Sequence, residues 1–387
     1  MGAASVLVIG AGLPATAAAG PVPDAAPPQW EQVKLPSGNA VLSGTVKPDA
    51  RTTWAAGFRV PQDDGGLSPV LYTHDDRSSG PWKEMSTASD FTGRINALAA
   101  TSARDAWLVG DVAWEGEPVM AQHWDGRSWR VKPAPMPANT LGGGLLGVAA
   151  VSASNVWAAG WSQVLDKRIP DPDGGTEIVD HNEGLVQHWD GHAWKPSKLP
   201  QPYANWGLNA ISASGPKDVW AVGSGYGDDD QPVVLHFDGR SWTAMPTPPY
   251  GGVYGEFNDV VAKGPRDVWV VGRTLLDDKD RGHALIVHWD GHKWTRMDAP
   301  GDAGGLSGVA ATRAGIVAVG RAANDDGGYA LRASGTRVTS LGFPTNADGM
   351  SDSPWKISVT GGVVSISGSA RYVSEQGPQP LLLTTRL

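Results

Sequence analysis

A block of apolar residues around one tryptophan, ending in glycine, recurs along the chain. It reads TWAAG, AWLVG, VWAAG, VWAVG and VWVVG, with its tryptophan at Trp54, Trp107, Trp157, Trp220 and Trp269. Weaker copies follow at IVAVG, where Val317 replaces the tryptophan, and at VSISG, which ends at Gly368. A self-similar unit of roughly 50 residues is typical of the blades of a β-propeller.

Each block lies between a short apolar segment and a predicted hairpin. The hairpins AQHWDGRSWR, VQHWDGHAWK, VLHFDGRSWT and IVHWDGHKWT all have Asp-Gly at their centre. Asp-Gly favours the type I′ turn, whose twist suits two antiparallel strands. The first and sixth repeats have hairpin equivalents without Asp-Gly, LYTHDDRSSGPWK and ALRASGTRVTS. Each repeat therefore predicts four strands.

The two ends of the chain predict how the ring closes. The C-terminal PLLLTTRL resembles a third strand without a fourth, and Trp30 to Pro36 matches the fourth strand at Trp194 to Pro200. Pairing of these ends removes the free sheet edges. We therefore expect an all-β fold, a seven-bladed β-propeller over residues 29–387, with four antiparallel strands per blade and the last blade closed by the N-terminal strand.

The N-terminus and the composition indicate export. Residues 1–20 contain an apolar stretch from Val6 to Leu13 and small residues typical of a signal peptide, and residues 21–28 form a Pro/Ala-rich linker. The net charge is −9 and no basic run is present, so nucleic acid is not expected as a partner. No later stretch is long and apolar enough to span a membrane. We expect a secreted, extracellular protein.

The repeats resemble those of secreted actinobacterial proteins with DVWAVG and HWDGxxW blocks, as at Asp218 to Gly223 and His288 to Trp294. The chain is broadly similar to kelch and galactose-oxidase-like propellers. The resemblance covers nearly all of the mature chain and implies the fold. A galactose-oxidase-like copper site is not expected, because its cross-linked cofactor requires a cysteine and this chain has none.

Residues that recur at one repeat position are expected to be structural. The hairpin histidines lie in different blades, too far apart to share a metal, and the hairpin aspartates serve the turns. These residues are His123, His188, His236 and His288, with Asp125, Asp190, Asp238 and Asp290.

Aromatic residues outside the repeat pattern map to one face of the propeller. This loop face carries the connections between the second and third strands of each blade and between consecutive blades. Those second-to-third-strand loops also hold half of the 40 acidic residues. The candidate ligand-binding residues are Trp114, Trp161, Trp206, Tyr203, Tyr226, Tyr250, Tyr254, Asp228 and Asp229. The alternative is that the rings only cover loop backbone and that the acidic surface has no partner.

No cofactor is expected, and calcium has only a weak signal. Asp171 to Gly174, Asp228 to Asp230 and Asp277 to Asp280 offer clustered oxygen ligands, but none has the full D-x-D-x-D-G spacing.

Catalytic motifs are missing from the sequence: it has no G-x-S-x-G elbow, no cysteine nucleophile and no H-E-x-x-H. A sialidase-like hydrolase is a minor alternative. GFRVP at Gly57 to Pro61 is similar to the motif of that family's first carboxylate-binding arginine, and Arg273, Arg321 and Arg371 follow the corresponding strand elsewhere. That family uses six blades, however, and no tyrosine–glutamate pair can be assigned as nucleophile.

The preferred hypothesis is therefore a non-catalytic binding protein that recognises a cell-surface or extracellular glycan in a lectin-like manner. The alternative is a protein-interaction scaffold, or a subunit of a larger secreted assembly, that uses the same face for a secreted or cell-surface protein.

Overall fold

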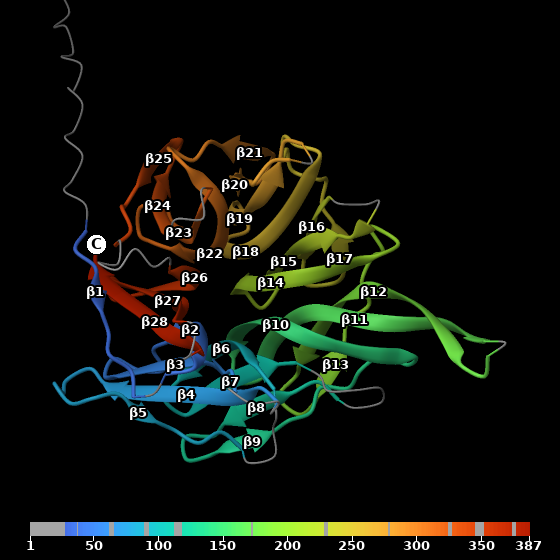
Figure 1. Cartoon of the computed structure of the whole chain (residues 1–387), viewed down its shortest axis with the longest axis horizontal. Coiled ribbons are helices and arrows are strands. Elements are labelled where there is room, and N and C mark those ends of the chain that lie inside the picture. The colour runs from blue at the N-terminus through green and yellow to red at the C-terminus, as the bar shows by residue number, and fades with distance from the viewer. Residues whose placement is uncertain are drawn as a thin grey trace, which may run out of the picture.

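The computed structural model describes residues 28–387 except for 37, 62–65, 89–92, 112–117, 172, 228–230, 278, 324–326, 345–351 and 374–376, and without the side chains of 371–373. Seven four-stranded antiparallel sheets are arranged around a centre (Figure 1). The chain is a seven-bladed β-propeller, as the repeats predict.

The first three blades run in sequence order from the innermost strand to the outermost. Blade 1 contains β2 (Ala40–Val46), β3 (Thr52–Arg59), β4 (Ser68–Asp75) and β5 (Lys83–Glu84). Blade 2 contains β6 (Ile95–Ser102), β7 (Asp105–Gly110), β8 (Ala121–Trp124) and β9 (Trp129–Val131). Blade 3 contains β10 (Thr140–Ser152), β11 (Asn155–Pro170), β12 (Thr176–Trp189) and β13 (Trp194–Pro196).

The remaining blades follow the same order. Blade 4 contains β14 (Trp206–Gly215), β15 (Asp218–Gly225), β16 (Pro232–Phe237) and β17 (Trp242–Ala244). Blade 5 contains β18 (Tyr254–Gly264), β19 (Asp267–Leu275), β20 (His283–Trp289) and β21 (Trp294–Met297). Blade 6 contains β22 (Ala303–Ala311), β23 (Ile316–Ala322), β24 (Gly328–Ser334) and β25 (Arg337–Ser340). Blade 7 contains β26 (Ser353–Thr360), β27 (Val363–Val373), β28 (Gly377–Arg386) and β1 (Glu31–Gln32).

The predicted closure of the ring is confirmed. Strand β1 pairs antiparallel with β28, so that Glu31 lies opposite Thr384 and Gln32 opposite Leu383. The Thr385 hydroxyl donates a hydrogen bond of 2.7 Å to the Gln29 carbonyl. The first strand of the described chain is therefore the outermost strand of the last blade.

Every innermost strand contains a β-bulge at the same place. The extra residues are Ser43, Asn96, Leu146, Asn209, Asn258, Ser307 and Trp355. Five of them are polar, and each of these donates to a carbonyl of the next blade; Asn96 Nδ2, for example, lies 3.0 Å from Leu145 O. A bulge changes the direction in which a side chain points. The bulge residues therefore join neighbouring blades by hydrogen bonds near the central axis.

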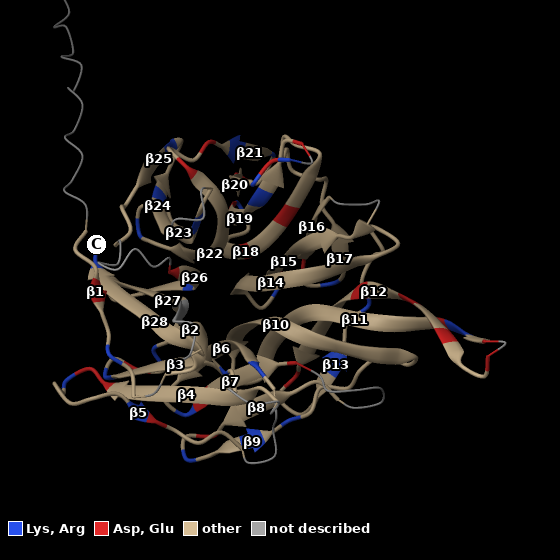
Figure 2. Ribbon diagram, viewed as in Figure 1, with Lys and Arg blue, Asp and Glu red and all other residues tan. Residues whose placement is uncertain are grey.

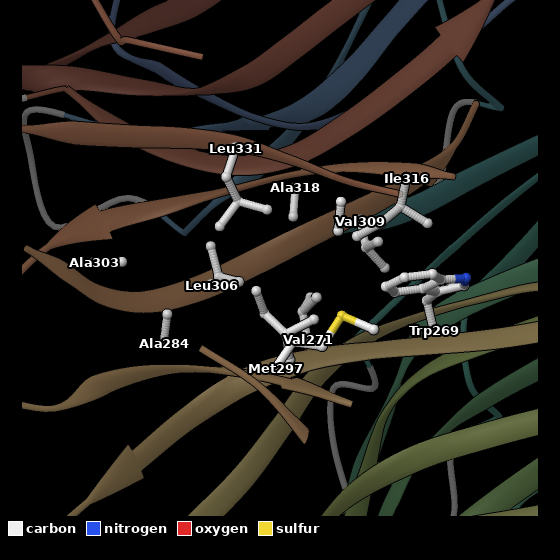
Figure 3. Close-up of a cluster of buried hydrophobic side chains, with 12 residues drawn as sticks. Trp269, Val271, Ala284, Met297, Ala303, Leu306, Val309, Ile316, Ala318 and Leu331 are labelled. Atoms are coloured by element: carbon white, nitrogen blue, oxygen red, sulfur yellow. The ribbon is translucent and has the colours of Figure 1, made fainter. Parts of the chain in front are cut away.

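Tryptophans fill the seams between the early blades. Trp107 of blade 2 packs against Trp189 and Trp194 of blade 3, with ring centroids 4.8 and 5.1 Å away. The seams between blades 1 and 2, 3 and 4, and 4 and 5 have the same arrangement. Figure 3 shows the next seam, where Trp269 of blade 5 packs among aliphatic side chains such as Ile316 and Met297. Within its own blade its ring stacks on His288.

The recurring histidines and aspartates make contacts within blades 2 to 5. His236 stacks on Trp220 with a centroid distance of 4.1 Å, and its Nε2 lies 2.8 Å from Asp218 Oδ1. His123 and His288 make the equivalent bonds to Asp105 and Asp267. In the Asp-Gly turns the aspartate accepts from two backbone N–H groups, as Asp125 does from Arg127 and Ser128. These contacts confirm that the repeated polar residues are structural.

The insertion in blade 3 is a regular two-stranded extension. Strands β11 and β12 stay paired out to Pro170 opposite Thr176, so they form a hairpin that projects beyond the ring (Figure 1). Acidic and basic residues are mixed near its tip (Figure 2). On this hairpin His181 lies 3.0 Å from Asp166 and 3.1 Å from Glu183; burial opposes protonation, but these hydrogen bonds raise the pKa of His181.

Candidate ligand-binding site at the channel mouth

The innermost strands surround a narrow channel on the propeller axis. A cavity of 210 Å³ there is lined by residues of β2, β6, β10, β14, β18 and β26. Lys356 Nζ of blade 7 reaches across to Asp259 Oδ1 of blade 5, at 3.1 Å. Asp259 Oδ2 also accepts a hydrogen bond from the Val309 amide. This ion pair therefore joins blades 5 and 7 across the channel.

One position in each blade lies toward the loop face, directly after the glycine of the apolar block. The second strand ends close to this position in blades 1, 2, 4, 5 and 6 and continues past it in blades 3 and 7. The block itself is nearly constant, but this position differs from blade to blade. Its occupants are Phe58, Asp111, Trp161, Ser224, Arg273, Arg321 and Ser369.

Side chains of blades 7, 1 and 2 form one half of a ring around the mouth. The rings of Trp355 and Phe58 lie 5.9 Å apart, and the Arg94 guanidinium lies 5.7 Å from the centroid of Phe58. Arg94 Nε donates to Asp111 Oδ2 at 2.6 Å. This half therefore has an aromatic pair, Trp355 and Phe58, followed by an ion pair, Arg94 and Asp111.

Asp111 connects this half to blade 3 across Gly144. A Cβ placed on Gly144 would lie 3.4 Å from Asp111 Oδ1 and 3.8 Å from Trp161 Nε1. Glycine here lets the two side chains approach over the backbone of blade 3. Trp161 in turn adjoins Gly207 of blade 4, whose added Cβ would meet the Trp161 Cβ at 3.3 Å and the Tyr226 hydroxyl at 2.5 Å.

Blade 5 supplies a tight cluster of three side chains. Arg273 Nε lies 3.3 Å from Glu256 Oε1, and its guanidinium lies 5.6 Å from the centroid of Tyr254. The Tyr254 hydroxyl donates to Glu256 Oε2. Alternate residues of β18 bring the Tyr254 and Glu256 side chains to the same side of the strand, so the structure contains a tyrosine–glutamate pair that the sequence did not reveal.

Burial and the Glu256 charge suppress ionisation of the nearby tyrosines. Burial raises the pKa of Tyr254, and the hydrogen bond to Glu256 raises it further. Burial and the negative charge of Glu256 likewise raise the pKa of Tyr226. Both phenols therefore remain protonated hydrogen-bond donors at neutral pH.

A cavity of 290 Å³ lies where blades 5, 6 and 7 meet at the mouth. Its charged lining residues are Arg273, Arg281, Arg321 and Glu256, so arginines outnumber acids in a chain of net charge −9. Trp355, with 39% of its surface exposed, lies at the same cavity. Guanidinium groups beside an open aromatic ring suit an anionic ligand with a flat body.

The structure brings together three of the predicted aromatic residues, Trp161, Tyr226 and Tyr254. Tyr203 and Tyr250 are half-buried and pack against the cores of blades 4 and 5 instead. Trp114, Asp228 and Asp229 lie outside the described residues.

The prediction that Trp206 binds a ligand is wrong. It begins strand β14 with 1% of its surface exposed, its ring lies against Gly184, and its Nε1 donates to Gln201 Oε1 at 2.8 Å. The ring closes the space beneath the long hairpin of blade 3, which is why it cannot reach a ligand.

Sequence reasoning missed Trp355, Phe58, Arg94 and Arg281. The position after the block glycine would have identified Phe58 and grouped it with Trp161, Arg273 and Arg321. Trp355 occupies the bulge position that is serine, asparagine or leucine in the other blades. An alignment of the seven repeats would therefore have singled it out. Nothing local in the sequence marks Arg94 or Arg281.

Metal ligands do not gather in the described part of the chain: no three His, Asp or Glu side chains there could hold an ion together. Asp171 accepts the Asp173 amide within its own turn. No helix of the described residues has the length and apolarity that a membrane span requires.

Comparisons with known proteins define the fold class only. No family model matches the chain, and no curated protein matches it in sequence. A solved structure titled "YCF48 bound to D1 peptide" has a TM-score of 0.57 and 14% identity, covering 95% of this chain and 97% of the other. The polysaccharide lyase Uly1 also has a TM-score of 0.57, with 9% identity, covering 91% of this chain and 90% of the other. Together with the seven sheets, these similarities confirm the β-propeller class.

Proposed function

We propose that this protein is a secreted, non-catalytic binding protein that recognises acidic extracellular polysaccharide at the channel mouth. The observation that carries the proposal is the cavity with Arg273, Arg281 and Arg321 beside the exposed Trp355. Export is proposed from the apolar N-terminal stretch of the sequence.

The chemistry of the mouth suits a uronic acid residue. A planar guanidinium can bind a carboxylate with two parallel hydrogen bonds, and arginine keeps its charge at every physiological pH. Aromatic rings offer flat apolar faces against which a sugar ring can lie. Ser307, Ser353 and Asn258 line the same cavity and can exchange hydrogen bonds with hydroxyl groups.

Binding is favoured over catalysis because the two groups that could move a proton are already engaged. Glu256 is held by Arg273 and by Tyr254, and Tyr254 has a raised pKa. A general base works best when its pKa lies near the operating pH, and the raised pKa of Tyr254 takes its phenol further from that condition. The similarity to a polysaccharide lyase supports a polysaccharide ligand at the level of the fold, although at 9% identity it assigns no chemistry to this chain.

Titration of oligosaccharides into the protein tests the proposal. We expect oligogalacturonate to bind and neutral cello-oligosaccharides of equal length to bind at least tenfold more weakly, which is about 1.4 kcal/mol. Arg321→Ala combined with Arg281→Ala should weaken oligogalacturonate binding by a further tenfold or more. Arg240→Ala is the matched control, because Arg240 is exposed in an Asp-Gly turn at the opposite end of the blades. Equal affinity for the neutral and acidic sugars would refute the proposal.

A second candidate is a protein-interaction scaffold that binds an acidic peptide at the same mouth. It is favoured by the similarity over 95% of this chain to a propeller bound to a peptide. The hairpin β11–β12 adds a projecting edge that a protein partner could contact. Peptides rich in Asp and Glu that bind tightly while oligogalacturonate does not would select this candidate.

A further inference from the structure

The seam between blades 6 and 7 lacks the aromatic filling of the earlier seams. Val317 occupies the position of the block tryptophan, and the position that is Trp124 in blade 2 and Trp189 in blade 3 is Thr385 in blade 7. Trp30 remains, but its ring lies toward Phe343, 6.4 Å away, and its Nε1 donates to Gly342 O. The indole volume present at four other seams is therefore missing here.

A groove occupies this space and opens on the turn face, the face that carries the turns between the first and second strands. Its volume is 790 Å³. The apolar floor and walls are Ile316, Val317, Ala333, Leu341 and Val359, with Leu387, 53% exposed, at the edge. The size is that of a site for a small organic molecule.

Positive charge surrounds the groove. Arg313, Arg332 and Arg386 line it, all three side chains are exposed, and no Asp or Glu is among the lining residues. Arg332 Nε donates to Thr339 Oγ1 at 3.1 Å, which holds that guanidinium in place. In a chain of net charge −9, three arginines around one apolar groove form a local anion-attracting surface.

We propose that this groove is a second binding site, separate from the mouth, for a small organic anion with a flat aromatic body. The aromatic part occupies the space that an indole fills at the other seams, and the carboxylate or sulfonate group meets the arginines. The two sites lie at opposite ends of the blades, so they can be occupied independently.

Fluorescence titration with 1-anilinonaphthalene-8-sulfonate tests the proposal on the full folded chain. We expect saturable binding of one probe, displaced by indole-3-acetate and at least tenfold less effectively by neutral indole. Val317→Trp should abolish the binding, because it restores the residue that five blades carry at this position. Arg386→Ala should weaken it about tenfold without altering the packing, since Arg386 is exposed.

Arg104→Ala is the matched control for the charge contribution. Arg104 lies in the turn between the first and second strands of blade 2, the turn that holds Arg313 in blade 6. Trp54, Trp124 and Trp129 fill the seam there, so removing the Arg104 side chain should leave probe binding unchanged. Probe binding that survives Val317→Trp in a variant with native thermal unfolding would overturn the proposal. The proposal would also be overturned if neutral indole displaced the probe as effectively as indole-3-acetate. The same holds if Arg104→Ala weakened probe binding as much as Arg386→Ala does.

Discussion

Blades 1 to 5 and blades 6 and 7 reach the same four-stranded shape with different interiors. In the first group a tryptophan from each of blades 1 to 4 meets two aromatic rings of the following blade. In the second group the core consists of smaller residues, including Val317, Val319, Leu341 and Ile357. The blade geometry therefore does not depend on tryptophan. It depends on strand pairing and on apolar side chains of either kind.

The same difference in side-chain size separates closely packed seams from the open seam between blades 6 and 7. Large rings interdigitate and leave little space, whereas aliphatic residues at the last seam leave the groove on the turn face. Dispersion contacts grow with the number of packed atoms, so the aromatic seams should carry more of the stability of the ring.

The largest expected effect is on stability when one tryptophan is truncated. Trp107 is fully buried between blades 2 and 3, so Trp107→Ala should lower the free energy of unfolding by about 4 kcal/mol. Val317→Ala, at the same repeat position in blade 6, should cost about 2 kcal/mol. Urea unfolding measures both, and equal losses would contradict the distinction between the seams.

A smaller effect on stability is expected from removing the hydrogen bond that a bulge residue donates to the next blade, which both regions contain. Asn96 donates to Leu145 O at 3.0 Å in the tryptophan-rich region, and Ser307 donates to Pro354 O at 2.7 Å in the other. Asn96→Ala and Ser307→Ala should each lower the free energy of unfolding by about 1 kcal/mol. Asn96→Ser should restore part of the loss. If only one of the two variants lost stability, the contribution of the bulge hydrogen bond would depend on how the neighbouring seam is packed.

The smallest expected effect is a pH dependence present only in the tryptophan-rich blades. Burial opposes ionisation of Asp218, but hydrogen bonds from His236, Ser214 and Trp220 lower its pKa below 3.8. A lowered pKa stabilises the fold above pH 3.8, and this contribution disappears as the pH falls through the folded-state value. Asp218→Asn should therefore cost up to about 1 kcal/mol at pH 7, and this cost should become smaller as the pH falls below 3.8.

The control for this pH dependence is Arg332→Gln in blade 6. Arg332 stands where blades 2 to 5 have a histidine, and arginine does not titrate in this range. Its stability difference from the parent should be the same at pH 7 and near pH 2. Urea unfolding at the two pH values checks both variants, and a pH-independent cost of Asp218→Asn would contradict the assigned role.

The fold was predictable because its signals are local and repeated. Seven copies of one apolar block, four Asp-Gly hairpins and matching chain ends determine the number of blades, the strand count and the closure. The candidate binding site was only partly predictable. Its residues come from different blades, and the residue type at each of these positions differs from one repeat to the next. Trp206 was misassigned because a tryptophan outside the repeat pattern is indistinguishable in sequence from one that covers a long hairpin.

The pairing of β1 with β28 has a consequence for the order in which the molecule is assembled. Glu31 is among the first residues of the domain to be synthesised, and its partner Thr384 is among the last. Each of the first six blades can form as soon as its own repeat emerges, but the outer edge of the seventh stays open until the final strand arrives. Contacts this distant in sequence form late and slowly. A truncated product would therefore be a row of folded blades with two unprotected ends, and such edges invite association with other chains.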